Sequence, residues 1–217
     1  MIKLCIFDLD GTLTNTLPAI SHFGNTALGA IGLGKISTDR YRYLVGDGRD
    51  ILIHRMLAEF DADTDENFKN AVRAYDMAYE NDPLYKTAPY DGIFELLKAL
   101  KDAGVVLCVL SNKPDNVVGD IVKLFFGDTF AYAMGHRAEN KIKPDPESAL
   151  YIMEKFGADP SETVFIGDTD VDIKTGKNAG VKTVGVLWGF REKEELLAAR
   201  ADFLAVKPMD IFDEIMK

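Results

Sequence analysis

Residues 2–13 read IKLCIFDLDGTL, and this stretch decides the fold. Its first half, residues 2–7, is a short apolar run of the length of a buried strand. The run continues into Asp8 and Asp10, and Gly11 follows them, which indicates a turn where the strand ends. We therefore predict a buried first strand that places two carboxylates at one edge of a sheet.

The next segment has a different pattern. From Thr16 to about Tyr85, apolar residues recur every three or four positions and no convincing strand occurs. This spacing is typical of amphipathic helices. Thr16 is expected at the N-cap of the first helix, with Pro18 in its first turn.

From Pro89 onward, short apolar runs alternate with helical patterns. The expected strands are 105–110, 131–134, 163–166, 183–187 and 203–206, and the expected helices are 91–103, 115–126, 146–156, 171–179, 192–199 and one at the C-terminus. Strands that alternate with helices predict a parallel sheet covered on both faces. The expected fold is therefore α/β, a Rossmann-like, doubly wound parallel sheet with a helical insertion after its first strand.

The chain length agrees with this organisation. Domains average about 150 residues, so 217 residues suggest one domain enlarged by a smaller unit. We expect residues 1–14 and 89–217 to form the Rossmann-like core. Residues 15–88 are expected to form the inserted helical domain.

The composition limits the partners of the chain. It is 47% hydrophobic and carries a formal net charge of -10, which argues against a surface that coats nucleic acid or binds an anionic membrane. The first acid, Asp8, comes too early for a signal peptide, and no apolar stretch is long enough to span a membrane. We expect a cytoplasmic protein in which Cys5 and Cys108 are buried free thiols.

Polar residues follow several of the expected strands. They are Asp8 and Asp10; Ser111, Asn112 and Lys113; Lys141 and Lys143; and Asp168, Asp170 and Asp172. Ligands of a doubly wound sheet bind at the carboxyl ends of its strands, so these side chains are expected to converge. Crowded carboxylates favour a hard cation such as Mg²⁺, and a lysine and a hydroxyl beside it would complete a receptor for a phosphoryl group.

Two competing motifs lack residues that they require. The run DTDVD (168–172) begins like a calcium-binding EF-hand loop, but Ile173 and Ala179 stand where glycine and glutamate are required. The run GAIGLGKI (29–36) follows a helix and lacks the Ser/Thr of a P-loop. We expect Asp170 to serve as a helix N-cap.

Four segments in order resemble the motifs of the haloacid dehalogenase superfamily: DLDGTL (8–13), SNK (111–113), KPDP (143–146) and GDTDVD (167–172). The resemblance covers essentially the whole chain and identifies the helical insertion as the cap domain of this family. Within the superfamily the chain is most similar to phosphoglycolate phosphatases, whose Gly-rich cap loop resembles GDGRD (46–50).

The resemblance implies the chemistry of the site. Asp8 would attack phosphorus and form an aspartyl phosphate, and Asp10 would act as general acid and then as general base. Mg²⁺ would be held by Asp8, the backbone carbonyl of Asp10, Asp168 and, directly or through water, Asp172.

The resemblance also implies contacts to the substrate. Ser111 and the backbone N–H of Asn112 would bind a phosphoryl oxygen, and Lys143 would neutralise charge, with Lys141 as the alternative. Arg49, in the Gly-rich cap loop, would contact the part of the substrate beyond the phosphate.

Other functions stay open. A β-phosphoglucomutase-like enzyme uses the same two aspartates, although Gly167 precedes Asp168 where the mutases usually carry glutamate. A pyrophosphatase or nucleotidase differs only in the leaving group, and a non-enzymatic protein would be expected to lack one of the acids. Thr14 and Asn15 stand where many relatives have Val-Asp, which weakens the assignment within the superfamily. The substrate and the oligomeric state, monomer or dimer, are not determined by the sequence.

Overall fold

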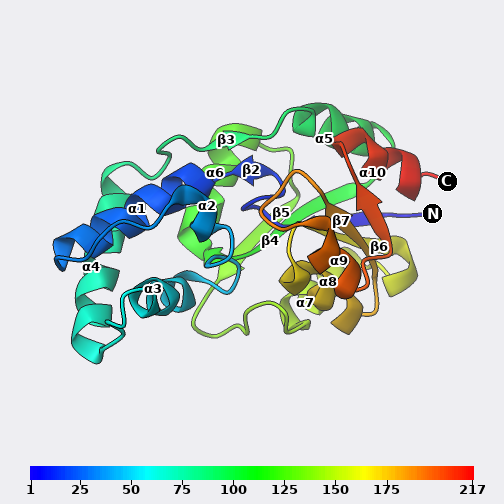
Figure 1. The fold of residues 1–217 in the computed structure, drawn as a ribbon. Helices are drawn as coiled ribbons and strands as arrows, with labels where there is room; N and C mark the ends of the chain where they lie inside the picture. Colours follow the sequence, from blue (N-terminus) through cyan, green and yellow to red (C-terminus); the bar gives the residue numbers. More distant parts are fainter. The chain divides into compact units, whose positions relative to one another are not determined.

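Strand β1 (Leu4–Phe7) is fully buried near the middle of a six-stranded sheet in the computed structural model, which describes residues 1–217 (Figure 1). The other strands of the sheet are β4 (Val106–Pro114), β5 (Tyr132–His136), β6 (Thr163–Gly167), β7 (Lys182–Val186) and β8 (Phe203–Ala205). All neighbouring strands are parallel, in the order β5-β4-β1-β6-β7-β8. The predicted parallel sheet is confirmed.

The strand order creates a topological switch point at β1. After β1 the chain adds β4 and β5 on one side, then returns to add β6, β7 and β8 on the other side. Loops that leave such a point diverge and open a crevice beyond the carboxyl ends of the strands, where ligands of these folds bind. The residues that follow β1, β4 and β6 therefore have the position of a site.

Helices lie between the strands of this unit along the chain and after the last strand (Figure 1). They are α5 (Ile93–Asp102), α6 (Asp115–Phe126), α7 (Glu147–Phe156), α8 (Asp170–Asn178), α9 (Lys193–Ala198) and α10 (Pro208–Ile215), with a 3₁₀ turn at Pro160–Glu162. The α/β class predicted from the sequence is confirmed. One difference is that β4 continues past Leu110 to Pro114, because Pro114 pairs with His136 after a register shift.

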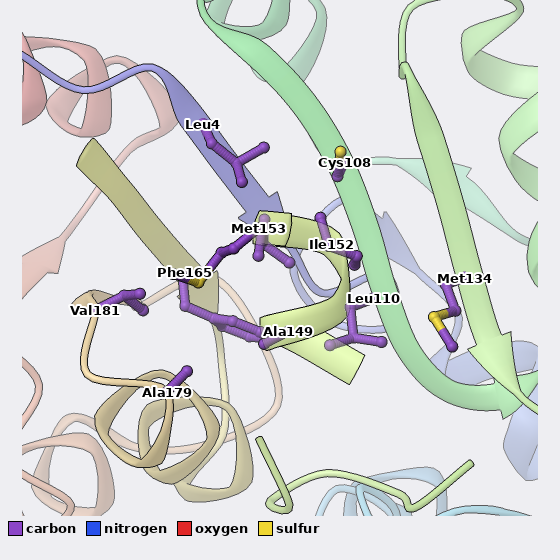
Figure 2. Packing of buried hydrophobic residues seen from close by; sticks show 11 residues of the cluster. Leu4, Cys108, Leu110, Met134, Ala149, Ile152, Met153, Phe165, Ala179 and Val181 are labelled. Carbon is purple, nitrogen blue, oxygen red and sulfur yellow. The ribbon is translucent and has the colours of Figure 1, made fainter. Parts of the chain in front are cut away.

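A cluster of apolar side chains joins the sheet to α7 (Figure 2). The residues are Leu4, Ile6, Cys108, Leu110, Met134, Ala149, Ile152, Met153, Phe165, Ala179 and Val181. They come from four adjacent strands, from α7 and from the end of α8. Burial of each large aliphatic side chain contributes about 1.5–3 kcal/mol, so this cluster holds the strands whose ends carry the polar residues.

The two cysteines are free and buried, as predicted. Cys5 lies opposite Leu107, whereas Cys108 lies opposite Ile6. Side chains alternate between the faces of a sheet, so the two thiols point to opposite faces and cannot form a disulfide. Burial raises the pKa of Cys108 to about 12, which makes this thiol unreactive in the folded protein.

Residues 16–87 form a separate compact unit, and residues 1–15 with 88–217 form the other. The helices of the smaller unit are α1 (Leu17–Ala30), α2 (Thr38–Tyr41), α3 (Arg49–Ala58) and α4 (Asp65–Asn81). The ring of Phe23 on α1 packs edge-on against Tyr75 and Tyr79 of α4. Thr16 occupies the N-cap position of α1, but its hydroxyl makes no capping hydrogen bond.

Two short antiparallel strands, β2 (Thr14–Asn15) and β3 (Ala88–Pro89), pair where the chain leaves and re-enters the larger unit. They were not predicted, because a strand of two residues has no detectable periodicity. None of the helices in either unit has both the length and the apolar character needed to span a membrane.

The contact between α7 and the sheet is testable at Ile152, which is completely buried in the apolar cluster. Ile152→Ala is expected to lower the free energy of unfolding by about 2–5 kcal/mol, because the deletion removes buried methyl groups and leaves a cavity. Urea denaturation would measure the loss. The matched control is Leu150→Ala on the same helix, where the side chain is 44% exposed; equal losses in both variants would contradict the assigned packing.

Candidate active site

Four of the segments that end or follow the central strands come together at one edge of the sheet. Asp8 follows β1 directly, Ser111 lies near the end of β4, and Asp168 follows β6. Asp172 lies in the first turn of α8, which begins just after Asp168. Lys143 is supplied by the loop between β5 and α7.

Lys143 forms ion pairs with two of the three acids at the centre of this site. Its Nζ donates to Asp8 Oδ1 at 2.7 Å and to Asp172 Oδ1 at 2.6 Å. All three side chains are at least nine-tenths buried. Burial alone would lower the pKa of Lys143, but the charges of Asp172 and Asp8 outweigh it and raise that pKa. Lys143 therefore stays protonated and links the end of β1 to the first turn of α8 through two ion pairs.

The acids exceed this single positive charge. Carboxylate oxygens of Asp8, Asp168 and Asp172 lie within 4.8 Å of one another. Burial raises the pKa of Asp8 well above its ordinary range despite Lys143, and the neighbouring acids add to the shift. Burial, together with the charge of Asp172, also raises the pKa of Asp168 to about 7. The cluster therefore lacks positive charge.

These residues suit a hard divalent cation. Three carboxylates against one ammonium leave a formal charge of −2, and oxygen atoms are the ligands that Mg²⁺ prefers. A bound divalent ion would supply the missing charge, which is the condition under which buried carboxylates stay ionised. Three of the four residues predicted to hold the metal, Asp8, Asp168 and Asp172, therefore form a group of carboxylates that suits Mg²⁺.

Asp168 is held by two hydrogen-bond donors that the sequence analysis did not assign to it. Its Oδ1 accepts from the Thr12 hydroxyl at 3.0 Å, and its Oδ2 accepts from the backbone N–H of Phe190 at 2.8 Å. Gly11 and Gly189 approach so closely that a Cβ on either would lie 2.3 Å or less from an Asp168 atom. Thr12 was visible inside the first motif, but the Phe190 contact uses a backbone group and has no sequence signal.

Helix α8 is capped by Thr169 together with Asp172, and not by Asp170. The N-cap of α8 is Thr169, and Asp172 Oδ2 accepts both the backbone N–H and the hydroxyl of Thr169, at 3.1 and 2.8 Å. Asp170 instead forms an ion pair with Lys174 one turn along the helix. The prediction of Asp170 as N-cap was wrong: Thr169, also a favoured capping residue, holds that position and forms a capping box with Asp172.

Asn112 forms a clamp on Lys143. Its side chain donates to the Lys143 carbonyl at 3.1 Å and accepts from the Lys143 N–H at 2.8 Å. Two hydrogen bonds to one backbone unit restrict the loop that carries the lysine. The neighbouring Ser111 accepts a hydrogen bond from the Lys113 N–H at 3.2 Å and is buried beside Asn112.

Asp10 lies beside a different lysine. Lys113 Nζ is 3.1 Å from Asp10 Oδ1 and 3.3 Å from Oδ2. The Lys113 and Asp10 side chains are 11% and 18% exposed, so this pair lies nearer to water than the ion pair of Lys143. Lys141, the alternative to Lys143, is 70% exposed and pairs with Asp145, so the structure does not bring it to the acids.

Arg49 belongs to the smaller unit, where it is the first residue of α3. Its Nη1 donates to both oxygens of Asp76, at 3.0 and 2.8 Å, and its Nε donates to Asp50 at 2.8 Å. The guanidinium is thus compensated by two carboxylates within its own unit. Its predicted contact with substrate stays a prediction.

Comparisons of the sequence with a family model and with known proteins point to the same family. Residues 5–186 match the family model of haloacid dehalogenase-like hydrolases. A phosphoglycolate phosphatase of Vibrio vulnificus is 32% identical over 220 residues, covering 99% of this chain and 96% of the relative. A phosphoglycolate phosphatase of Pasteurella multocida is 32% identical over 208 residues, covering 93% of each.

A solved structure agrees. The crystal structure of a predicted phosphoglycolate phosphatase from Haemophilus somnus superposes with a TM-score of 0.92 at 31% identity, covering 100% of this chain and 98% of the other. The chain therefore belongs to the haloacid dehalogenase-like hydrolases. Within that family it is an enzyme of the phosphoric monoester hydrolase class and resembles the phosphoglycolate phosphatases.

The raised pKa of Asp168 predicts how the metal-free protein responds to pH. In EDTA, the folded state keeps a proton on Asp168 up to about pH 7, whereas the unfolded chain releases it near the ordinary value of 3.8. The contribution of Asp168 to stability therefore falls as pH rises from about 4 to about 7. Asp168→Asn is expected to remove this contribution and to raise the Tm at pH 8 more than at pH 5.

The matched control is Asp170→Asn, which removes the same charge from a partly exposed carboxylate two positions away. Thermal unfolding of both variants and the wild type in EDTA, at pH 5 and pH 8, gives the comparison. If the Tm of Asp168→Asn changed between pH 5 and pH 8 by the same amount as the Tm of the wild type, the assigned burial of an uncompensated charge would be contradicted.

Proposed function

We propose that this enzyme is a Mg²⁺-dependent phosphatase that hydrolyses a small phosphate monoester such as phosphoglycolate through an aspartyl phosphate on Asp8. The observation that carries the proposal is the buried carboxylate of Asp8, 2.7 Å from Lys143 Nζ and beside two further acids. The names of the curated relatives support phosphoglycolate as the substrate class.

In the first step, a carboxylate oxygen of Asp8 forms a bond to phosphorus as the ester P–O bond breaks. The leaving alkoxide receives a proton from Asp10, so it departs as the alcohol. Lys143, whose Nζ is 2.7 Å from Asp8 Oδ1, would compensate the charge of the nucleophile and of the phosphoryl group. The Ser111 hydroxyl and the Asn112 N–H would donate to phosphoryl oxygens.

In the second step, water attacks phosphorus of the aspartyl phosphate and transfers a proton to Asp10. The bond between phosphorus and the Asp8 oxygen breaks, which releases inorganic phosphate and restores both aspartates. Asp8, Asp168, Asp172 and the backbone carbonyl of Asp10 would hold Mg²⁺. When bound, the ion supplies positive charge to the phosphoryl oxygens as a Lewis acid.

The proposal is tested by phosphate release from a panel of esters, with Mg²⁺ and with EDTA. The panel contains phosphoglycolate, glycerol phosphate, glucose 1-phosphate, a nucleoside monophosphate and pyrophosphate. Mg²⁺-dependent release, fastest from a small monoester, is expected. Isomerisation of glucose 1-phosphate without phosphate release would favour the mutase, and the absence of release from every compound would overturn the proposal.

Asp8→Asn is expected to lower kcat by at least about 10³-fold, because an amide cannot form the aspartyl phosphate. The change removes one negative charge from a buried cluster with surplus charge, so the variant is expected to keep the Tm of the wild type or exceed it. Activity and thermal unfolding are measured on the same preparation. A folded variant with wild-type turnover would eliminate Asp8 as the nucleophile.

Arg49 is proposed to contact the carboxylate of the substrate. Arg49→Glu is expected to raise KM for phosphoglycolate about 10-fold or more, the size of one lost charge-assisted hydrogen bond. KM for p-nitrophenyl phosphate, which has no carboxylate, should change much less. Arg40→Glu, which reverses a surface charge paired with Glu59 in the same unit, is the control. Equal changes for both substrates would remove Arg49 from substrate recognition.

A further inference from the structure

Lys113 contacts two groups that the proposed reaction uses. Its ammonium faces both oxygens of Asp10, at 3.1 and 3.3 Å. Its backbone N–H donates to Ser111 Oγ at 3.2 Å. Lys113 therefore connects the end of β4 to the turn after β1, 103 positions away along the chain.

The contact with Asp10 constrains the carboxylate. An ammonium at nearly equal distances from both oxygens resists rotation of the carboxylate plane, because rotation moves one oxygen away from the charge. Both side chains are largely buried, at 11% and 18% exposure, so the pair is less screened by water than a surface ion pair. Such a contact restricts where the Asp10 oxygens lie.

The contact with Ser111 concerns the phosphoryl group and not the leaving group. A hydroxyl has one proton and two lone pairs. Since Ser111 Oγ already accepts from the Lys113 N–H, its own proton is left to donate elsewhere. The same backbone unit that carries the Lys113 side chain thus orients a donor for the phosphoryl group.

We infer that Lys113 is a positioning residue that holds the carboxylate of Asp10 for proton transfer to the leaving group. This inference rests on the proposed function, since it assigns a partner to the proposed acid. The side chain of Lys113 acts through Asp10 and not on phosphorus. It is needed in proportion to how strongly the leaving group requires a proton.

That proportion gives the test. Alkyl phosphates release a basic alkoxide that needs the proton, whereas p-nitrophenyl phosphate releases a phenolate that departs without one. For Lys113→Met, kcat/KM is measured with glycerol phosphate, phosphoglycolate and p-nitrophenyl phosphate, because kcat/KM covers substrate binding and formation of the aspartyl phosphate and excludes its hydrolysis. The expected loss is about 10- to 100-fold for both alkyl esters and less than about 3-fold for p-nitrophenyl phosphate.

Two further variants complete the experiment. Lys113→Arg keeps a positive donor and is expected to recover most of the alkyl-ester activity. Lys123→Met removes an exposed lysine of α6 that pairs with Asp128, and it should leave all three substrates unchanged. Thermal unfolding confirms that each variant is folded before its kinetics are compared.

Each other outcome overturns the inference. Equal losses on all three substrates would assign Lys113 a general structural role. A loss confined to phosphoglycolate, expressed in KM and absent with glycerol phosphate, would make Lys113 a ligand of the substrate carboxylate. Absence of Mg²⁺-dependent turnover by the wild type would overturn the proposed function and the inference together, which separates that failure from the other two.

Discussion

The buried ion pair of Lys143 with Asp8 and Asp172 is the constraint on which the site depends. The lysine is 135 positions from Asp8 and 29 from Asp172, so the contact joins three separate parts of the chain. Taking these charges out of water is costly, and the cost is offset only when geometry is good and every charge has a partner. The ends of β1 and β6 and the loop before α7 must therefore meet accurately, and the apolar cluster beneath them holds that arrangement.

The same ion pair leaves part of the negative charge of the site unbalanced. Lys143 is shared by two acids, and Asp168 beside them accepts hydrogen bonds from two neutral donors, the Thr12 hydroxyl and the Phe190 N–H. Neutral hydrogen bonds stabilise a carboxylate but do not balance its charge, which is why burial still raises its pKa to about 7. A divalent ion and a phosphoryl group form a combination whose charges complement this surplus. The acidity of the chain as a whole is therefore compatible with an anionic substrate.

Much of this arrangement could be predicted because it depends on side-chain type and periodicity. The alternation of strands and helices predicted the sheet, and the strand ends predicted that Asp8, Lys143 and Asp168 would converge. The rest depends on geometry that periodicity does not encode. The approach of Gly189 to Asp168 uses the absence of a side chain, and the N-cap of α8 required a choice between two adjacent residues that are both favoured at that position. The extension of β4 past Leu110 depends on its pairing with β5.

The two lysines of the site differ in exposure, and each contacts an aspartate that differs in the same direction. Lys143, 4% exposed, contacts the proposed nucleophile, whereas Lys113, 11% exposed, contacts the proposed acid and base. A carboxylate nucleophile reacts in its unprotonated form, and a buried ammonium beside it favours that form. An acid that gives up a proton in one step and regains it from water in the next needs access to solvent. The difference in exposure between Asp8 at 8% and Asp10 at 18% agrees with the order of events in the proposed reaction.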